Sequence, residues 1–281
     1  MIAKFLTTLL AISMLTSAVW AQTKPSGKLY ELRSYVSEPG RQSDVLKLIA
    51  GGGMEYMKKH NLNLVAVWTP VDTKDERVFT LVSHKDKASC DAAWAAFQND
   101  AGWKEVVQKS AVDGKKPVQS FERVFLSEND YSPNLDTKQV GNRVFELRTY
   151  IASKGNLAAL NSRFRNHTLK LFEKYGMTNI AYWSVLDGES LTCGKLLEAV
   201  SPVGKATSDA DANMPATGNA LVYFIAHASP EAAQESFKKF GADADWTKAR
   251  KESEVGAGGS LTAGNGVKSL FLTPAPFSPL K

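Results

Sequence analysis

A histidine on an amphipathic segment is the first residue in this sequence whose type and position suggest chemistry. His167 follows Leu160 and Phe164 at helical spacing, and Leu171 comes next along the same face. We therefore expect His167 to point inward, with Arg163 one turn before it. An inward imidazole could bind haem or a metal ion, or act as a general base near neutral pH. The alternative is a core histidine that hydrogen-bonds to a strand.

The sequence identifies no cofactor and predicts no metal site. Zinc takes three or four ligands from its site, and a single histidine supplies one. The remaining histidines, His60, His84 and His227, do not group with His167 in the sequence.

A second set of polar side chains occurs twice in the chain. A carboxylate, a guanidinium and a phenol alternate in LYELRSYVSEPG and VFELRTYIASKG, as Glu31, Arg33, Tyr35 and as Glu146, Arg148, Tyr150. Alternation places each set on one face of a strand. In the second copy we expect Phe145, Leu147 and Ile151 to face the helices and the polar set to face the opposite sheet.

Charges buried between two sheets must be paired or hydrogen-bonded. Glu146 and Arg148 could pair across strands, or with Glu31 and Arg33 of the other copy, and so fix how the two copies meet. Alternatively, Arg148 could bind a carboxylate ligand inside the barrel while Tyr150 donates a hydrogen bond to it.

Tryptophans and cysteines are further candidates. Trp68 and Trp183 end strands, where we expect them to pack in the core, with a ligand platform as the alternative. Cys90 and Cys193 are the only cysteines. In an oxidising compartment they could form a disulfide, and otherwise they are two independent small hydrophobic residues.

Two copies of one pattern must position all these residues. The copies are offset by 115 residues at first, then by 143 and finally by 146, as in Glu31 to Glu146, His84 to His227 and Leu126 to Leu272. In the first copy we expect strands at 29–36, 62–69, 77–84 and 118–127 and helices at 41–60 and 86–110. This β-α-β-β-α-β order is the ferredoxin-like split unit, with both helices on one face of the sheet.

The open sheet faces must be covered, and two copies can cover each other. We therefore predict an α+β fold of two tandem ferredoxin-like domains, residues 22–133 and 134–281, that form an intramolecular pseudo-dimeric α/β barrel.

The copies differ at two places. Gly52 stands where the second copy has His167, and it lies between Gly51 and Gly53. Because a helical glycine costs about 1 kcal/mol relative to alanine, we expect a helix break, a bulge or close approach of a neighbouring surface; the alternative is space for a ligand. The second copy also carries an insert at residues 186–219, which we expect to be a loop, with a lid as the alternative.

The first 21 residues are typical of a signal peptide. Lys4 precedes an apolar stretch, and Val19 and Ala21 suit cleavage after Ala21. The stretch is shorter than the roughly 20 residues of a membrane span, so we expect a periplasmic or secreted protein without a transmembrane span. Removal of Lys4 lowers the formal net charge from +5 to +4, and the chain shows no basic cluster of the kind that binds nucleic acid.

The motifs of the second copy resemble the NIPSNAP family. The resemblance rests on ELRTY, on LFEKYGM and on Trp183 at the end of the next strand. It covers the second copy apart from its insert and, in more diverged form, the first copy. It implies the dimeric α/β-barrel group, whose members include haem-degrading and other small-molecule enzymes as well as binding proteins. Fold alone does not decide between these functions.

We expect a small-molecule binding or interaction role, with an apolar or carboxylate ligand, in a monomer or a higher homo-oligomer. The alternatives are an oxygenase- or isomerase-type enzyme with a pocket near His167, and a purely structural or interaction protein. The sequence identifies no catalytic residue; the candidate ligand-binding residues are His167, Arg163, Glu146, Arg148, Tyr150 and Trp183.

Overall fold

The computed structural model describes residues 28–135, 140–186 and 218–281. The predicted signal peptide with its cleavage site after Ala21, nearly all of the insert predicted at 186–219, and Cys193 lie outside the described residues. Within those ranges, no helix combines the length and the apolar character that crossing a membrane requires.

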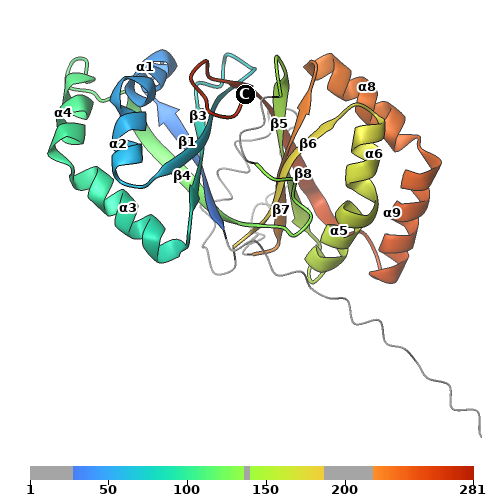
Figure 1. Ribbon diagram of the computed structural model, residues 1–281. Coiled ribbons are helices and arrows are strands. Elements are labelled where there is room, and N and C mark those ends of the chain that lie inside the picture. Colours follow the sequence, from blue (N-terminus) through green and yellow to red (C-terminus); the bar gives the residue numbers. More distant parts are fainter. Residues whose placement is uncertain (1–27, 136–139, 187–217) are drawn as a thin grey trace, which may run out of the picture.

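Eight antiparallel strands close into a barrel in the order β1-β3-β2-β8-β5-β7-β6-β4 (Figure 1). In chain order the strands are β1 Leu29–Ser37, β2 Asn63–Pro70, β3 Val78–His84, β4 Val118–Glu128, β5 Val144–Ala152, β6 Thr178–Val185, β7 Ala220–His227 and β8 Thr262–Pro274. The four strands predicted in the first copy agree with the structure to within one residue at each end. The prediction of an α+β fold built around a barrel is confirmed.

The barrel joins the two halves of the chain by reciprocal strand pairs. The last strand of the second half, β8, pairs with β2 of the first, where Trp68 lies opposite Pro274. The last strand of the first half, β4, pairs with β6 of the second, where Leu126 lies opposite Val185. Each half therefore contributes the strand that extends the sheet of the other.

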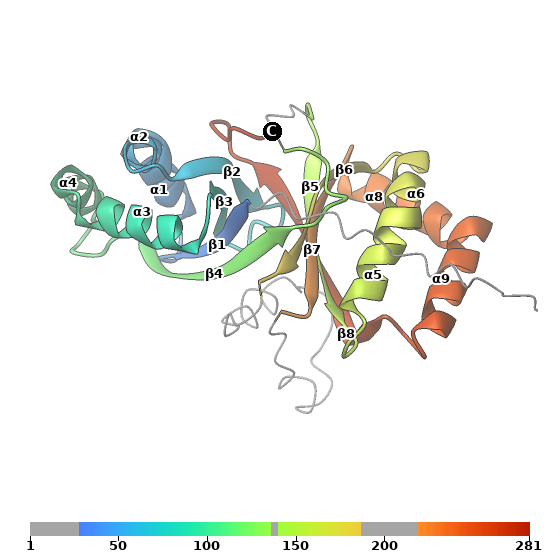
Figure 2. The same cartoon turned by 60° about the horizontal axis from the view of Figure 1, so that its bottom comes forward.

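Helices cover the outside of the barrel in two groups, one from each half (Figures 1 and 2). The first group is α1 Gln42–Leu48, the π-helical turn η1 Ile49–Gly53, α2 Met54–Lys59, α3 Lys87–Asn99 and α4 Ala101–Lys109. The second group is α5 Leu157–Arg163, the π-helical turn η2 Phe164–Thr168, α6 Leu169–Lys174, α8 Pro230–Gly241 and α9 Ala244–Gly256. The element order of the first half recurs in the second, and the π turns start 115 residues apart.

Both helices predicted in the first copy are interrupted. The helix predicted at 41–60 contains the π turn η1. The single helix predicted at 86–110 is wrong, because the backbone of Asp100 is extended and ends α3. Its carboxylate accepts hydrogen bonds from the N–H groups of Gly102 and Trp103 and so caps the start of α4.

The apolar face of each half's first strand points into the barrel. Leu32 and Leu147 are fully buried in one core with Trp68, Trp183 and Phe224. Trp68 stacks on Phe224 with ring centroids 4.7 Å apart.

The prediction that Phe145 and Leu147 face the helices, and the polar set the opposite sheet, is therefore wrong. Phe145 is also in the barrel core, and Glu146 instead contacts His227 on the side covered by helices. A small closed barrel fills its interior with side chains. In this barrel they are mostly aromatic and aliphatic, so a charged side chain would find few hydrogen-bond partners there. Alternation along a strand defines two faces but does not say which one the barrel encloses.

Candidate functional site

His167 does not point inward, and the prediction of an interior imidazole is wrong. The π turn η2 adds one residue to the helical repeat, so that Thr168 takes the buried position four residues after Phe164. Thr168 donates a hydrogen bond to the Arg163 carbonyl. His167 is exposed in a groove of about 700 Å³ between α6 and α9, lined mostly by charged residues such as Lys170 and Glu252.

Arg163 is buried, but it is not part of a site with His167. Its Nη1 lies 3.7 Å from Oε1 of Glu254, and its guanidinium lies over the ring of Trp246. Burial lowers the pKa of Arg163. The two candidates therefore occupy opposite sides of one helix, with Arg163 inside and His167 outside.

Glu146, Arg148 and Tyr150 come together with two residues of β7 beneath the helices of the second half. Glu146 Oε2 lies 2.9 Å from Nε2 of His227, and Arg148 donates to its other oxygen. Arg148 also donates to the hydroxyls of Tyr150 and Tyr223. Of the two predicted pairings, the one with Glu31 and Arg33 of the other half is wrong, because this network stays within one half. Glu146 instead pairs across strands with His227 and along its own strand with Arg148.

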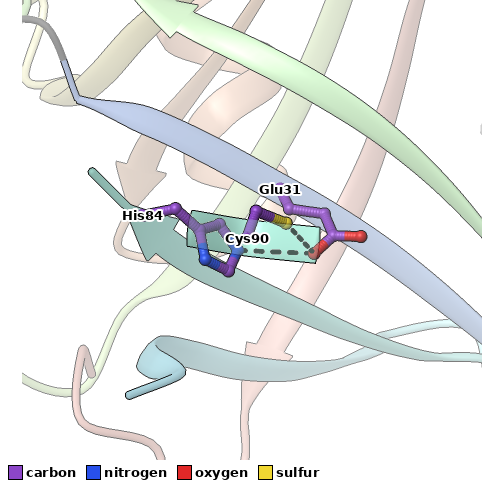
Figure 3. Close-up of side chains that lie close together, drawn as sticks. All are labelled: Glu31, His84 and Cys90. Atoms are coloured by element: carbon purple, nitrogen blue, oxygen red, sulfur yellow. Dashed lines mark hydrogen bonds and ion pairs between the residues drawn. The ribbon is translucent and has the colours of Figure 1, made fainter. Parts of the chain in front are cut away.

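The first half has a matching network on its own helix-covered side, and Figure 3 shows three of its members, Glu31, His84 and Cys90. Glu31 is fully buried; Nε of Arg33 donates to its Oε1 over 2.8 Å, and Nε1 of Trp94 donates to its Oε2 over 2.6 Å. The guanidinium of Arg33 lies 3.4 Å from the centroid of the Trp94 ring. His84 and Cys90 lie against Oε2 of the same carboxylate, and Nη1 of Arg123 lies 3.6 Å from its Oε1.

Both buried glutamates are held in the charged form. Burial by itself raises the pKa of each carboxyl, but the neighbouring donors and cations outweigh it. His84, Arg33 and Trp94 hold the pKa of Glu31 below its usual value. His227 and Arg148 do the same for the pKa of Glu146.

An apolar pocket opens beside the network of the first half, the one around Glu31. It has a volume of about 200 Å³ and lies between the helical segment α1-η1-α2 and the pair α3 and α4. Trp94 connects the two features, since its ring lines the pocket while its indole N–H is bound to Glu31. The walls are almost entirely apolar, and the lining includes Tyr35, Leu48, Ile49, Met57, Phe97 and Trp103.

The corresponding place in the second half holds larger side chains. Phe164 replaces Ile49 and Phe172 replaces Met57, both at the offset of 115. Phe164 contacts Phe172 and Tyr223 edge to face, with ring centroids 6.3 and 5.2 Å apart. At these two positions, therefore, larger aromatic side chains occupy space in the second half that smaller side chains do not occupy in the first.

The glycine run helps to shape the pocket. A Cβ on Gly52 would lie 3.2 Å from Cγ1 of Val106, so the glycine allows α4 to pack closely on the π turn. Gly53 is part of the pocket lining. The expected bulge and the expected close approach are both present, and the alternative of space for a ligand agrees with the pocket.

The structure does not gather the candidates of the sequence into one site. Trp183 is packed in the barrel core against Tyr30, and Cys90 is buried beside Glu31 and forms no disulfide among the described residues. Sequence reasoning missed Trp94 and the pocket. One signal was available: Trp94 corresponds to Phe237 and Cys90 to Ala233 at the offset of 143, so the copies differ around one shared glutamate.

Comparison with solved structures supports the barrel fold. The chain is similar to a candidate monooxygenase from Lactobacillus acidophilus NCFM, with a TM-score of 0.52 and 12% identity over 88% of this chain and 94% of that one. It is also similar to a NIPSNAP-like domain protein from Burkholderia xenovorans, with a TM-score of 0.34 and 16% identity over 38% of this chain and 90% of that one.

A NIPSNAP family protein from Agrobacterium tumefaciens str. C58 gives a TM-score of 0.34 and 19% identity over 38% of this chain and 97% of that one. No curated protein matches the sequence. The family profile for NIPSNAP matches residues 30–133, the half that holds the apolar pocket. Residues 30–133 of this chain are therefore a NIPSNAP domain.

Proposed function

We propose that this protein binds a small apolar molecule in the pocket of its first half. The observation that carries the proposal is the difference between the halves, which share their element order but differ in how this volume is filled. A volume of about 200 Å³ exceeds the roughly 150 Å³ of an engineered apolar cavity that binds benzene. The ligand is therefore of the size of a single ring or a short alkyl chain.

The ligand carries one polar end. The pocket is apolar in its interior, whereas Lys116 and Gln98 line it and are exposed to solvent. A carboxylate placed there would meet the ammonium of Lys116 and the amide of Gln98. Apolar walls with few polar groups are the usual composition of a small-molecule site.

The two halves have different roles in this proposal. We regard them as tandem ferredoxin-like units that form an internal pseudo-dimer, with the first as the binding unit and the second as its filled scaffold. We also retain the proposal that the chain is exported through its N-terminal segment to the periplasm or the exterior. The alternative of an oxygenase- or isomerase-type enzyme with a pocket near His167 rests on the resemblance to the barrel group, since the imidazole lies exposed in a groove lined mostly by charged residues.

Mass spectrometry of the intact, natively folded protein from its own host tests the proposal by revealing a retained ligand. Calorimetric titration with toluene and with phenylacetate provides defined probes. Ile49→Phe with Met57→Phe copies the residues that fill the second half and should abolish binding, whereas His167→Ala should leave it unchanged. Binding of toluene but not of phenylacetate would contradict the proposed polar end of the ligand and would leave the apolar pocket as a binding site. No retained ligand together with no binding of either probe would contradict the pocket as a binding site.

A further inference from the structure

The two buried networks differ in how histidine meets glutamate. In the second half, Nε2 of His227 hydrogen-bonds to Oε2 of Glu146 over 2.9 Å. In the first half, Nε2 of His84 stands 3.4 Å from Oε2 of Glu31 and has no hydrogen-bond partner among the described residues. A buried ring nitrogen without a hydrogen bond is costly, which indicates that another group completes its surroundings.

A thiol stands beside this opened pair. Sγ of Cys90 lies 3.8 Å from Oε2 of Glu31, and the residue is fully buried. The equivalent residue in the second half, where the pair is closed, is Ala233. In the first half, therefore, the histidine and glutamate are too far apart for a hydrogen bond and a cysteine sulfur lies beside them. In the second half the pair is hydrogen-bonded and an alanine replaces the cysteine.

The spacing of the three atoms matches that of ligands around one metal ion. The nitrogen, oxygen and sulfur all lie within 4.8 Å of one another. Tetrahedral zinc holds such ligands about 2.0–2.3 Å from the metal, which sets them about 3.3–3.8 Å apart. The distances of 3.4 Å and 3.8 Å from the Glu31 oxygen fall in this range.

We propose that Glu31, His84 and Cys90 bind a divalent metal ion of the zinc type. One carboxylate oxygen, one imidazole nitrogen and one thiolate form the mixed set of ligands that zinc accepts. This inference is independent of the pocket proposal, because the cluster lies behind the ring of Trp94 rather than in the pocket lining.

The surroundings of Glu31 suit a carboxylate that binds a metal. Trp94 donates to the oxygen that would bind the ion, and Arg33 donates to the other one. Such outer hydrogen bonds fix the orientation of a ligating carboxylate. An oxygen has two lone pairs, so Oε2 can accept from the indole and still bind the metal.

Cys90 must lose its proton to bind. Burial, with the Glu31 charge beside it, raises the pKa of the free thiol to about 12. A divalent cation in contact with the sulfur reverses this, since a coordinating thiol is deprotonated. Metal binding therefore forms a metal–sulfur bond and releases one proton to solvent.

A groove open to solvent passes beside His84, whose imidazole is itself buried. A groove of about 790 Å³ is lined by His84, Ser89 and Ala93, together with the lysines Lys28, Lys59 and Lys85. Because the side chain of His84 is only 1% exposed, an ion entering from this groove requires local opening of the protein, and water or a small anion from the groove would then supply the fourth ligand. The lysines favour an anion in that position.

Titration of the reduced full-length protein with Co²⁺ tests the proposal, since cobalt replaces zinc and reports a thiolate ligand by a near-ultraviolet charge-transfer band. We expect one ion per chain, displaced by Zn²⁺. Cys90→Ala should abolish the band, and since it copies Ala233 of the second half it should fold. Cys193→Ala, the control for the other thiol, should keep the band.

Two results would overturn the proposal. The first is the absence of Co²⁺ and Zn²⁺ binding to the reduced wild-type protein. The second is a band that survives Cys90→Ala or disappears with Cys193→Ala. Glu31→Gln and His84→Ala provide the remaining arms, in which we expect at least tenfold weaker Zn²⁺ binding by calorimetry, with folding checked by circular dichroism.

Discussion

Nε1 of Trp94 donates a hydrogen bond of 2.6 Å to Oε2 of Glu31. One indole therefore connects the buried carboxylate of Glu31 to an apolar pocket beside it in the first half. The second half has an equivalent carboxylate, that of Glu146. The counterpart of Trp94, Phe237, also packs on an arginine, Arg148, but has no N–H to donate. The halves keep the carboxylate and its arginine and differ in what surrounds them.

Trp94→Phe should destabilise the protein by about 1.5–3 kcal/mol, because it removes a hydrogen bond to a buried charge while keeping the ring over Arg33. Urea unfolding measures the change. A double-mutant cycle with Glu31→Gln separates this bond from packing. Equal effects of Trp94→Phe in the wild-type and Glu31→Gln backgrounds would show that the bond contributes nothing.

Arg148→Met should cost about 3–5 kcal/mol in unfolding free energy. The substitution keeps much of the apolar stem but leaves Glu146 buried without its cation, and the hydroxyls of Tyr150 and Tyr223 lose a donor. Chemical denaturation measures the loss. Arg165→Met, at a partly exposed pair with Asp130, serves as the control and should cost about 1 kcal/mol or less. Similar losses from the two substitutions would contradict this account.

Stability should fall with acid through Glu146. The pKa of this carboxyl is lower in the folded protein than its ordinary value of 4.5, so the unfolded chain binds the proton more tightly. Its contribution is fully present above that value and is lost as the pH falls below it toward the lowered pKa. Unfolding free energies of wild type and Glu146→Gln, measured from pH 7 to pH 3, should therefore converge at the acid end. Parallel curves would contradict the prediction.

Deletion of His167 should be tolerated better than deletion of Lys170. Removing one residue from the π turn η2 converts it to regular α-helix and keeps the flanking turns in register. Removing one from α6 rotates the following residues by about 100° relative to the preceding helix and turns Leu171 and Phe172 away from the core. Thermal unfolding compares the two, and an equal or larger loss for the His167 deletion would contradict the role of the π turn.

The barrel could be predicted from the sequence because the same strand pattern occurs in both copies. Strand pattern and offsets agreed in both copies, so Glu31 and Glu146 could be placed on first strands and His84 and His227 on strand ends. The helical pattern predicts one helix through residue 110, although Asp100, followed by Ala-Gly-Trp, is a capping residue type. The Asp–x–Gly–Trp pattern recurs only in part, as Asp243-Ala-Asp-Trp, so the repeat does not mark the break.

The candidate site was less predictable because it depends on packing. His167 has the spacing of a buried residue, and only the extra residue of the π turn moves it outside. The face of Glu146 and Arg148 depends on which side of the sheet the barrel encloses, which alternation does not specify. The pocket depends on the exchange of Ile49 for Phe164 and Met57 for Phe172, and such an exchange has meaning only once the two halves are superposed.

The strand pairs β2–β8 and β4–β6, which join the halves, make the repeating unit smaller than the folding unit. If the chain were cut between β4 and β5, each half would leave two sheet edges unpaired and one apolar face exposed to water, which promotes aggregation. Substitutions that unfold the second half should therefore also abolish ligand binding in the first, because we expect the two halves to unfold together. The second half therefore remains necessary to the fold even though its own side chains occupy the place of the pocket, because it pairs with both sheet edges of the first half.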